Sequence, residues 1–373
     1  MANILDYIRW RGDLPFSADP PNAIDSLVFS VLVYIRFAGR AVSEPSVPVP
    51  LHEVAEEFFQ QEDCKQRAIQ KHQQLLQLAA ASQRFGTAQM VRFRDRFEPE
   101  ADTQFAAAAF LLDDGSLFLT FRGTDNTLVG WKEDFEMCFQ QSVPSQRFAL
   151  EYVQELYSVY GAPMYICGHS KGGNLAVYAA AKSPPEVRRI IRDVYNNDGP
   201  GFTQYMMGDP GYLEMVPRIH TFVPQSSIIG LLMEHEEPYS IIKSDQVSVL
   251  QHDILTWEVM GKELIPVQEL TADSKFLQAT FQNWLRGMDM EERNKMVDNL
   301  FELLATGNVE RAGDIFLPKN THQYMKRISA DKSMRQAITE GIGDIFEAAM
   351  KAGKTSELPE EPEIPEAPKP TEI

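Results

Sequence analysis

Residues 164–182 of this 373-residue chain read MYICGHSKGGNLAVYAAAK, and this stretch decides the fold. The apolar run MYIC predicts a short buried strand, and the alanine-rich run from Gly172 to Lys182 predicts a helix that ends before Pro184 and Pro185. A glycine-rich turn joins the two. A strand that passes directly into a helix is half of a βαβ unit, so the stretch predicts an α/β fold with a parallel sheet.

The same alternation continues on both sides of this stretch. The runs FAAAAFLL (105–112) and LFLTF (117–121) flank Asp-Asp-Gly-Ser and predict a hairpin, and a helix follows at 146–160, closed by Gly161. Later strand-like cores lie at 189–196, 219–223, 239–242 and 247–250. Together they predict an α/β class with a mostly parallel sheet and helices on both faces.

Both ends of the chain have a helical pattern. A core helix is expected from Leu27 to Phe37, capped by Asp25 or Ser26, and two or more helices are expected within 51–80. Further helices are expected within 274–316 and at 332–351. The predicted organisation is therefore a helical segment at 1–100, an α/β core at 101–272, a helical segment at 273–352 and a disordered Pro/Glu tail at 353–373.

The composition excludes several classes of protein. With 44% hydrophobic residues and a net charge of −18, the chain can bury a sizeable core and repels nucleic-acid phosphate. Cys64, Cys138 and Cys167 have neither disulfide nor zinc spacing. No secretory signal is apparent, and the apolar stretch 27–37 is too short to cross a bilayer. We expect a cytoplasmic protein without a transmembrane segment; nothing specifies its oligomeric state.

The turn at residues 168–172 is a G-x-S-x-G sequence centred on Ser170. A nucleophile elbow needs small residues beside the serine, because the turn is strained and strand and helix approach closely; Gly168 and Gly172 supply them. The flanking strand and helix are the context that this motif requires. The alternative is that Ser170 only caps the helix.

An acyl-transfer site also needs donors for the oxyanion that develops in the transition state. The backbone N–H of Lys171, which follows the nucleophile, is one candidate. Thr124, in the turn after the strand 117–121, is the second, through its N–H and hydroxyl groups. The alternative is that Arg122-Gly123-Thr124 is an ordinary turn at the end of a strand.

These motifs together resemble the class 3 lipases. The resemblance rests on FRGT (121–124), the following Trp131 and Asp134 in GWKEDF, and GHSKGG (168–173). A longer frame, from NILDYIRWRGDLPF through NNDGPGF and VPQSSIIGLLMEHEE to QHDILTWEV, is similar to a bacterial lipase-like family of unknown function. The resemblance implies an α/β-hydrolase fold and a Ser170/acid/His triad.

The general base is expected to be a histidine after the nucleophile. His252 follows the strand-like run VSVL and falls where the resembling lipases place theirs, although a surface histidine capping a loop is the alternative. His220 and His235 are expected to be structural. His169 lies in the elbow, with its side chain expected to point away from that of Ser170.

The acid is the least determined member of the triad. In class 3 lipases it follows the next-to-last strand, but the corresponding stretch here, 222–227, contains no carboxylate. Asp198, after the preceding strand, is the replacement candidate, or else a turn aspartate bonded to its own backbone; Glu234 and Glu237 are weaker candidates. Loss of the orienting acid lowers turnover by up to roughly four orders of magnitude.

The sequence therefore predicts a serine hydrolase that cleaves a carboxylic ester or lipid-like acyl substrate, with no metal and no organic cofactor implied. The segment GLLM (230–233) is a candidate apolar lid or acyl-binding wall, and plain core is the alternative. Two alternatives stay open: a non-catalytic binding protein on the same fold, and a thioesterase or acyltransferase that uses the same nucleophile.

Overall fold

The computed structural model describes residues 1–39, 47–98, 103–125, 127–286 and 290–305, with residues 100, 323, 324, 326, 327 and 335. The helix expected at 332–351 and the tail expected at 353–373 lie outside the described residues, apart from position 335. The main sheet consists of β1 (Val49–Pro50), β2 (Gln89–Glu98), β3 (Thr103–Leu111), β4 (Leu117–Phe121), β5 (Met164–His169), β6 (Ile191–Asn197), β7 (Ile219–Pro224) and β8 (Tyr239–Ile242).

The strands lie in the sheet in the same order as in the sequence. The strands β1 to β4 pair antiparallel, and β4 to β8 pair parallel. The predicted hairpin of β3 and β4 is confirmed, as are the predicted strands at 164–167, 189–196, 219–223 and 239–242. This is the expected α/β class, an α/β-hydrolase-like fold.

The sheet separates two hydrophobic cores because successive side chains on a strand point to opposite faces. On β3, Phe105, Ala107 and Ala109 belong to one core, and Ala108 and Phe110 belong to the other. Small alanines at the centre of β3 let helices on both sides approach the backbone. The central strands are thereby buried on both faces, which explains their almost continuous apolar sequences.

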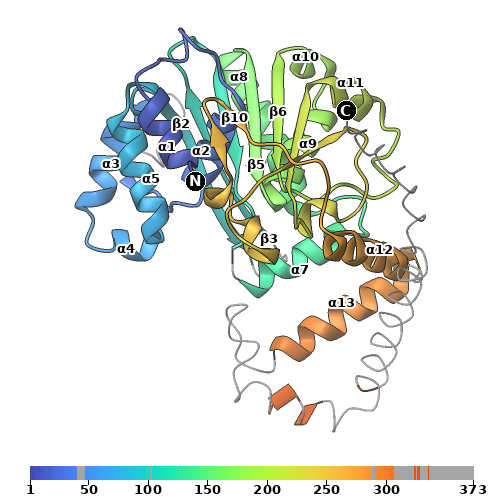
Figure 1. Cartoon of the computed structure of the whole chain (residues 1–373). Coiled ribbons are helices and arrows are strands. Elements are labelled where there is room, and N and C mark those ends of the chain that lie inside the picture. Colours follow the sequence, from blue (N-terminus) through green and yellow to red (C-terminus); the bar gives the residue numbers. More distant parts are fainter. Residues whose placement is uncertain are drawn as a thin grey trace, which may run out of the picture.

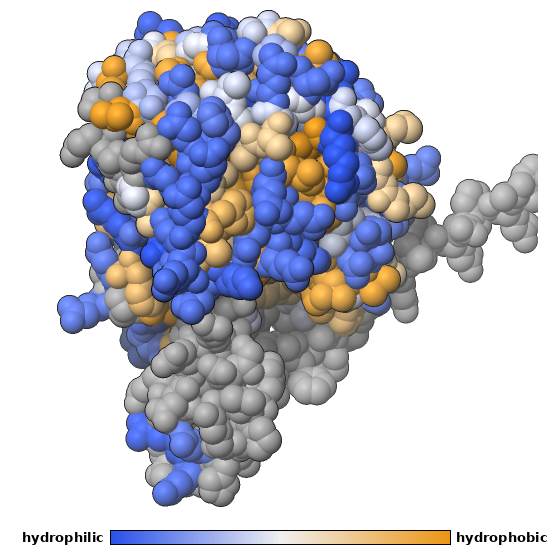
Figure 2. Space-filling model, turned by 90° about the vertical axis from the view of Figure 1, so that its left-hand side faces the viewer, coloured by the Kyte–Doolittle hydropathy of each residue, from blue (hydrophilic) through white to orange (hydrophobic). Residues whose placement is uncertain are grey.

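Helices cover both faces (Figure 1). On one face α2 (Ala23–Leu32) lies against β5, and the other N-terminal helices pack around it: α1 (Ile4–Arg11), α3 (Leu51–Gln60), α4 (Cys64–Arg67), α5 (Gln70–Ala81) and α6 (Gln83–Gly86). The outward side of this layer is mostly hydrophilic (Figure 2). The other face carries α8 (Pro144–Tyr160), α9 (Lys171–Lys182), α10 (Pro185–Arg188) and α11 (Pro210–Met215).

Three further helices lie beyond the carboxyl ends of the parallel strands (Figure 1). They are α7 (Leu128–Met137), α12 (Ala272–Arg286) and α13 (Met290–Ala305). Helix α13 contacts α7 through the rings of Phe135 and Phe301, whose centroids are 5.9 Å apart, and through Lys132 and Asp298 at 3.4 Å. Parallel α/β sheets bind their ligands at this edge.

The structure differs from the sequence expectations at three elements. Helix α2 ends at Leu32, and Asn22 caps it, because Asp25 is buried in an ion pair with Arg84 (2.6 Å). The expected N-terminal helical segment also contains β1 and the ten-residue strand β2, in which half-buried arginines alternate with other residues. Residues 247–250 are not a strand; they fall at a 3₁₀ helix, η5 (Ser248–His252).

The isolated position of residues 247–250 explains that last error. Val247, Val249 and Leu250 are exposed, and no strand of the described residues lies beside them. Their β-branched pattern therefore cannot form the backbone hydrogen bonds of a sheet. No described helix is long and apolar enough to span a membrane.

Candidate active site

Ser170 lies between the end of β5 and the start of α9 in a strained conformation. Its φ of 58° and ψ of −134° fall outside the regions that side chains other than glycine ordinarily occupy. The approach of strand and helix is close: a Cβ atom on Gly172 would lie 2.1 Å from the carbonyl oxygen of Phe121, and one on Gly168 would lie 2.1 Å from the backbone of Gly172. The local geometry is that of a nucleophile elbow.

His252 and Asp198 form a hydrogen-bonded pair next to this elbow. His252 ends η5, Asp198 follows β6, and the His252 Nδ1 atom is 2.6 Å from Asp198 Oδ2. The carboxylate side chain is 1% exposed, whereas the imidazole is 30% exposed. An ionised Asp198 selects the tautomer with the proton on Nδ1, which leaves Nε2 as an acceptor.

Two further donors hold the Asp198 carboxylate. Its Oδ1 atom accepts from the Ser227 hydroxyl (2.5 Å) and from the Gly230 N–H (3.2 Å). Ser227 ends the stretch 222–227 that lacks a carboxylate. This stretch therefore contributes a hydrogen bond to Asp198, which lies at the end of the neighbouring strand.

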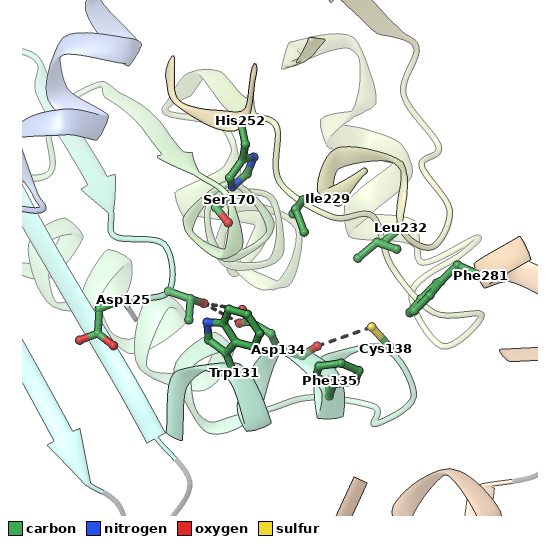
Figure 3. Close-up of a pocket in the computed structure, with 11 residues that line it drawn as sticks. Asp125, Trp131, Asp134, Phe135, Cys138, Ser170, Ile229, Leu232, His252 and Phe281 are labelled. Carbon is green, nitrogen blue, oxygen red and sulfur yellow. Dashed lines mark hydrogen bonds between the residues drawn. The ribbon is translucent and has the colours of Figure 1, made fainter. Parts of the chain in front are cut away.

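The ring of His252 lies directly beside Ser170, with both residues lining the same cavity (Figure 3). The structure places Ser170 beside the hydrogen-bonded pair of His252 and Asp198, with no hydrogen bond between Ser170 and His252 among the described residues. A strained serine, a histidine and a buried carboxylate in this order can transfer an acyl group.

Thr124 also lines this cavity, and its hydroxyl is already engaged. Its Oγ1 atom is 2.7 Å and 2.6 Å from the two carboxylate oxygens of Asp134 on α7. Removal from bulk water raises the pKa of Asp134 to about 6, a shift that the nearby Lys171 ammonium and the Thr124 hydrogen bond oppose. The Thr124 hydroxyl is thus held in place by Asp134, which leaves the backbone N–H as the simpler oxyanion donor.

Lys171 is buried, and its side chain turns away from the cavity. The Nζ atom donates to Glu133 Oε2 (2.9 Å) and to the Gln104 carbonyl (2.9 Å), and the lysine and glutamate side chains are 1% and 0% exposed. This ion pair ties the elbow to α7. The backbone N–H of Lys171 belongs to the first turn of α9, where N–H groups have no partner within the helix.

His169 supports the backbone at His252. Its Nδ1 atom is 3.1 Å from the Tyr34 hydroxyl, its Nε2 atom is 2.8 Å from the His252 carbonyl, and the two imidazole centroids are 4.5 Å apart. Burial lowers the pKa of His169 well below its usual value, so the ring is neutral. Both ring nitrogens are occupied, and His169 is not placed to take a proton from Ser170.

The remaining candidates lie in other networks. His220 contacts Asp193 (2.7 Å), and His235 contacts Glu237 (3.0 Å) and the Gly230 carbonyl (2.9 Å). Glu237 also accepts from Thr221 and Tyr212, and Glu234 accepts from Gln204. Neither glutamate contacts His252.

The cavity at Ser170 has a volume of about 400 Å³ and an apolar lining. Its side chains come from three separate regions: Trp131, Phe135 and Cys138 at α7, Ile229 and Leu232 after β7, and Phe281 on α12 (Figure 3). Burial raises the pKa of the Cys138 thiol to about 12, so it stays protonated at neutral pH. Leu232 belongs to the segment 230–233 that the sequence indicated as an acyl-binding wall.

Sequence reasoning missed helix α7 and several residues that shape the site. Thr127 caps α7 by accepting from the Gly130 N–H, and a threonine before a helical run is a recognisable start signal. Asp134 entered only as part of a resemblance. The contributions of Ser227 and Phe281 have no signal in the sequence, because only packing brings them to the site.

Two comparisons with known proteins found matches. A model of the Mbeg1-like family matches residues 79–302. Among solved structures, the Rhizomucor miehei lipase propeptide complex is similar at 15% identity and a TM-score of 0.32, over 46% of this chain and 70% of that chain. No curated protein matches the sequence.

Proposed function

The chain belongs to the Mbeg1-like family, a lipase-like family, and from this premise we propose that it is a serine hydrolase with Ser170 as the nucleophile. The observation that carries the proposal is the 2.6 Å contact between His252 Nδ1 and Asp198 Oδ2 beside the strained Ser170. A protein that only bound its ligand would have no need for a buried carboxylate aligned with a histidine and a strained serine.

The proposed mechanism is acyl transfer to water. Ser170 Oγ attacks the substrate carbonyl carbon while His252 Nε2 takes the hydroxyl proton, and Asp198 stabilises the imidazolium. The tetrahedral intermediate collapses, the leaving group departs with the proton from His252, and the acyl group stays on Ser170. His252 then deprotonates a water molecule that releases the acid and restores the serine.

The proposed oxyanion donors are the backbone N–H groups of Lys171 and Thr124. Asp134 fixes the Thr124 hydroxyl through the two contacts described above, and thereby fixes the turn that carries the N–H. Preorganised donors are effective because they need no rearrangement as the charge develops.

The apolar cavity supports a carboxylic ester with an acyl chain as the substrate. Its aromatic and aliphatic lining offers little to a charged or peptide-like group, and hydrophobic transfer is worth roughly 0.8 kcal/mol for each buried methylene. We also propose that the chain is related to the class 3 lipases and that the protein is cytoplasmic. The chain is proposed to divide into four segments, with boundaries after residues 100, 272 and 352. Thioester hydrolysis and transfer of the acyl group to another acceptor would use the same acyl-enzyme. Adding a competing alcohol distinguishes transfer from hydrolysis, because transfer forms a new ester and hydrolysis forms the free acid.

The test is covalent labelling with a fluorophosphonate probe, followed by turnover of p-nitrophenyl esters of increasing acyl length. We expect labelling and turnover in the wild type, neither with Ser170→Ala, and a collapse of both with His252→Ala. His220→Ala is the matched control, because His220 also pairs with an aspartate but lies away from the cavity. Absence of labelling in a wild type whose circular dichroism shows a folded protein contradicts the proposal.

A further inference from the structure

A second cavity, of about 370 Å³, adjoins the apolar cavity at Thr124 and Asp125. It lies between the end of β4 and residues 65–72, which include the end of α4 and the start of α5. Its chemistry is opposite to that of the apolar cavity. Four cationic side chains line it, together with one carboxylate, that of Asp125; the cations are Arg36, Lys65, Arg67 and Arg122.

The cations of this basic cavity are only partly neutralised. Arg67, 31% exposed, pairs with Asp63 at the start of its helix at 2.8 Å, and Arg36, 56% exposed, contacts Asp125 at 3.3 Å and Asp95 at 3.9 Å; water weakens ion pairs at such positions. Lys65 is exposed and forms no ion pair within the described part of the chain. In a protein with a net charge of −18, this concentration of positive charge is a local exception.

Arg122 adds a buried donor to the basic cavity. Its side chain is 3% exposed, and its two terminal nitrogens donate to Asp95 at 3.2 Å and 2.8 Å. Its Nε atom has no hydrogen-bond partner among the described residues. A buried guanidinium N–H without an acceptor is costly, and an anionic ligand in the cavity is a suitable acceptor.

A third cavity, of about 460 Å³, continues this space around His252. It shares Tyr34 and His72 with the basic cavity and His252 with the apolar cavity, and it contains Lys71, which lies 3.4 Å from Asp253. Burial lowers the pKa of His72 to about 4, so this ring carries no charge at neutral pH. The side of the site where His252 would protonate a leaving group therefore opens toward cationic side chains.

The apolar cavity and the basic cavity meet at Thr124 and Asp125, which line both. Figure 3 shows Asp125 on one side of Ser170 and Phe281, within the apolar cavity, on the other. A substrate whose carbonyl carbon lies at Ser170 can thus place an apolar chain on one side and a charged group on the other.

We propose that the substrate is an acyl ester or thioester whose leaving group carries a phosphate. The acyl chain occupies the apolar cavity, and the phosphate binds in the basic cavity to Lys65 and Arg67, beside the guanidinium of Arg122. The phosphate takes no part in bond making; the leaving oxygen or sulfur receives its proton from His252. This inference names the substrate class of the proposed hydrolase and rests on that function for turnover, but not for binding.

Binding is tested first, on the Ser170→Ala protein, so that the result does not depend on catalysis. The probes are decyl phosphate and the neutral 1-decylglycerol, titrated calorimetrically below their aggregation concentrations. We expect decyl phosphate to bind more tightly, and its Kd to rise roughly tenfold when Lys65→Gln and Arg67→Gln are combined, as for the loss of a charge-assisted hydrogen bond.

The matched control is Arg9→Gln with Lys262→Gln, which removes the same charge from exposed ion-paired positions outside the three cavities. It should leave the Kd of decyl phosphate unchanged. Equal affinity for the two probes, or an equal loss in the control, overturns the proposal. A long-range effect of net charge would weaken binding in both double variants alike.

Turnover then distinguishes the sources of the phosphate. The substrates share a decanoyl group: 1-decanoylglycerol 3-phosphate, decanoyl coenzyme A and the neutral 1-decanoylglycerol. We expect kcat/KM to be higher for at least one phosphate-bearing substrate than for the neutral ester, and the ratio to fall roughly tenfold in the Lys65→Gln, Arg67→Gln protein. The glycerophosphate or the coenzyme A substrate, whichever is preferred, identifies the source.

Failure of this inference and failure of the proposed function give different results. Fluorophosphonate labelling with equal turnover of neutral and phosphate-bearing esters retains the hydrolase and overturns the phosphate site. Tight binding of decyl phosphate to a protein that is not labelled retains the phosphate site and overturns the hydrolase.

Discussion

The carboxylate of Asp198 and the imidazole of His252 are in contact at 2.6 Å although 54 residues separate them in the sequence. Asp198 follows β6, whereas His252 ends a 3₁₀ helix beyond β8. Because β6, β7 and β8 are parallel and adjacent, their carboxyl ends meet at one edge of the sheet and bring the segments that follow them together. Residues after different strands can thus share one proton-transfer path.

Asp198→Asn should lower kcat by about four orders of magnitude and leave the fold intact, because the amide keeps the shape but no longer stabilises the imidazolium. Ser227→Ala removes only one donor to the carboxylate and should cost no more than about tenfold. Steady-state kinetics with a p-nitrophenyl ester measures both. A Ser227→Ala loss as large as that of Asp198→Asn would show that orientation, rather than charge, governs His252.

Thr124→Val should lower kcat roughly a hundredfold with little change in KM, because the hydroxyl that Asp134 holds is lost and the oxyanion turn loosens. Thr124→Ser keeps the hydroxyl and is the matched control, which should retain most of the activity. Kinetics on both variants, with fluorophosphonate labelling to count active serines, checks this. Equal activity of the valine and serine variants would contradict a role for the hydroxyl.

The pH dependence should include Asp134, whose pKa is raised to about 6 by burial. Below that pH the protonated carboxyl no longer holds the Thr124 hydroxyl as an ionised acceptor, and this protonation should lower the activity. The acid limb of log kcat/KM against pH should be steeper in the wild type than in Asp134→Asn. The variant should also have a lower plateau. Equal slopes of the acid limb in the wild type and in Asp134→Asn would exclude a contribution of Asp134 to the pH dependence.

Asp134 should also destabilise the fold at neutral pH. Because its folded pKa lies above its ordinary value of 3.8, the native state favours the protonated form; the contribution of this group to stability is greatest below about pH 4 and is lost as the pH rises through 6, and it is small because the side chain is 37% exposed. Asp134→Asn should therefore have a Tm at pH 8 no lower than that of the wild type, and this advantage should shrink at pH 5. Thermal denaturation at both values measures it.

The buried pair of Lys171 and Glu133 should make the fold sensitive to single changes. Glu133→Gln leaves the buried Lys171 ammonium with only the more distant Asp134 carboxylate, at 3.9 Å, and should destabilise the protein by about 3 kcal/mol, whereas Lys171→Met with Glu133→Leu should be far less harmful. Urea denaturation of the single and double variants gives both values. A double variant no more stable than Glu133→Gln would contradict an electrostatic origin.

The size of the apolar cavity should set the acyl-chain preference. Leu232→Phe fills space between Ser170 and Phe281 and should shift the preferred p-nitrophenyl ester to a shorter chain, whereas Phe281→Ala should shift it to a longer one. Leu213→Phe, at an exposed position on α11, is the matched control. Unchanged profiles for both cavity variants would show that the acyl chain lies elsewhere.

The sequence by itself determined the features that depend on neighbouring residues. The elbow is one, because Gly168, Ser170 and Gly172 lie within five positions and only small residues permit the approach of strand and helix. The sheet is another, since the alternation of FAAAAFLL and LFLTF follows directly from the geometry of a strand. The strand predicted from the pattern of residues 247–250 was wrong, because these residues have no neighbouring strand to pair with and fall at a 3₁₀ helix.

Only the tertiary structure decided how distant segments meet. Asp198 had two interpretations in the sequence, as a turn aspartate or as the partner of a histidine, and the packing of η4 (Ile229–Leu231) and η5 placed its two oxygens against Gly230 and His252. From the sequence, the Thr124 hydroxyl was expected to be available as an oxyanion donor; in the structure it donates to Asp134 on α7. The basic and apolar cavities likewise arise between elements far apart in the chain, because a cavity is a property of packed surfaces and has no period in the sequence.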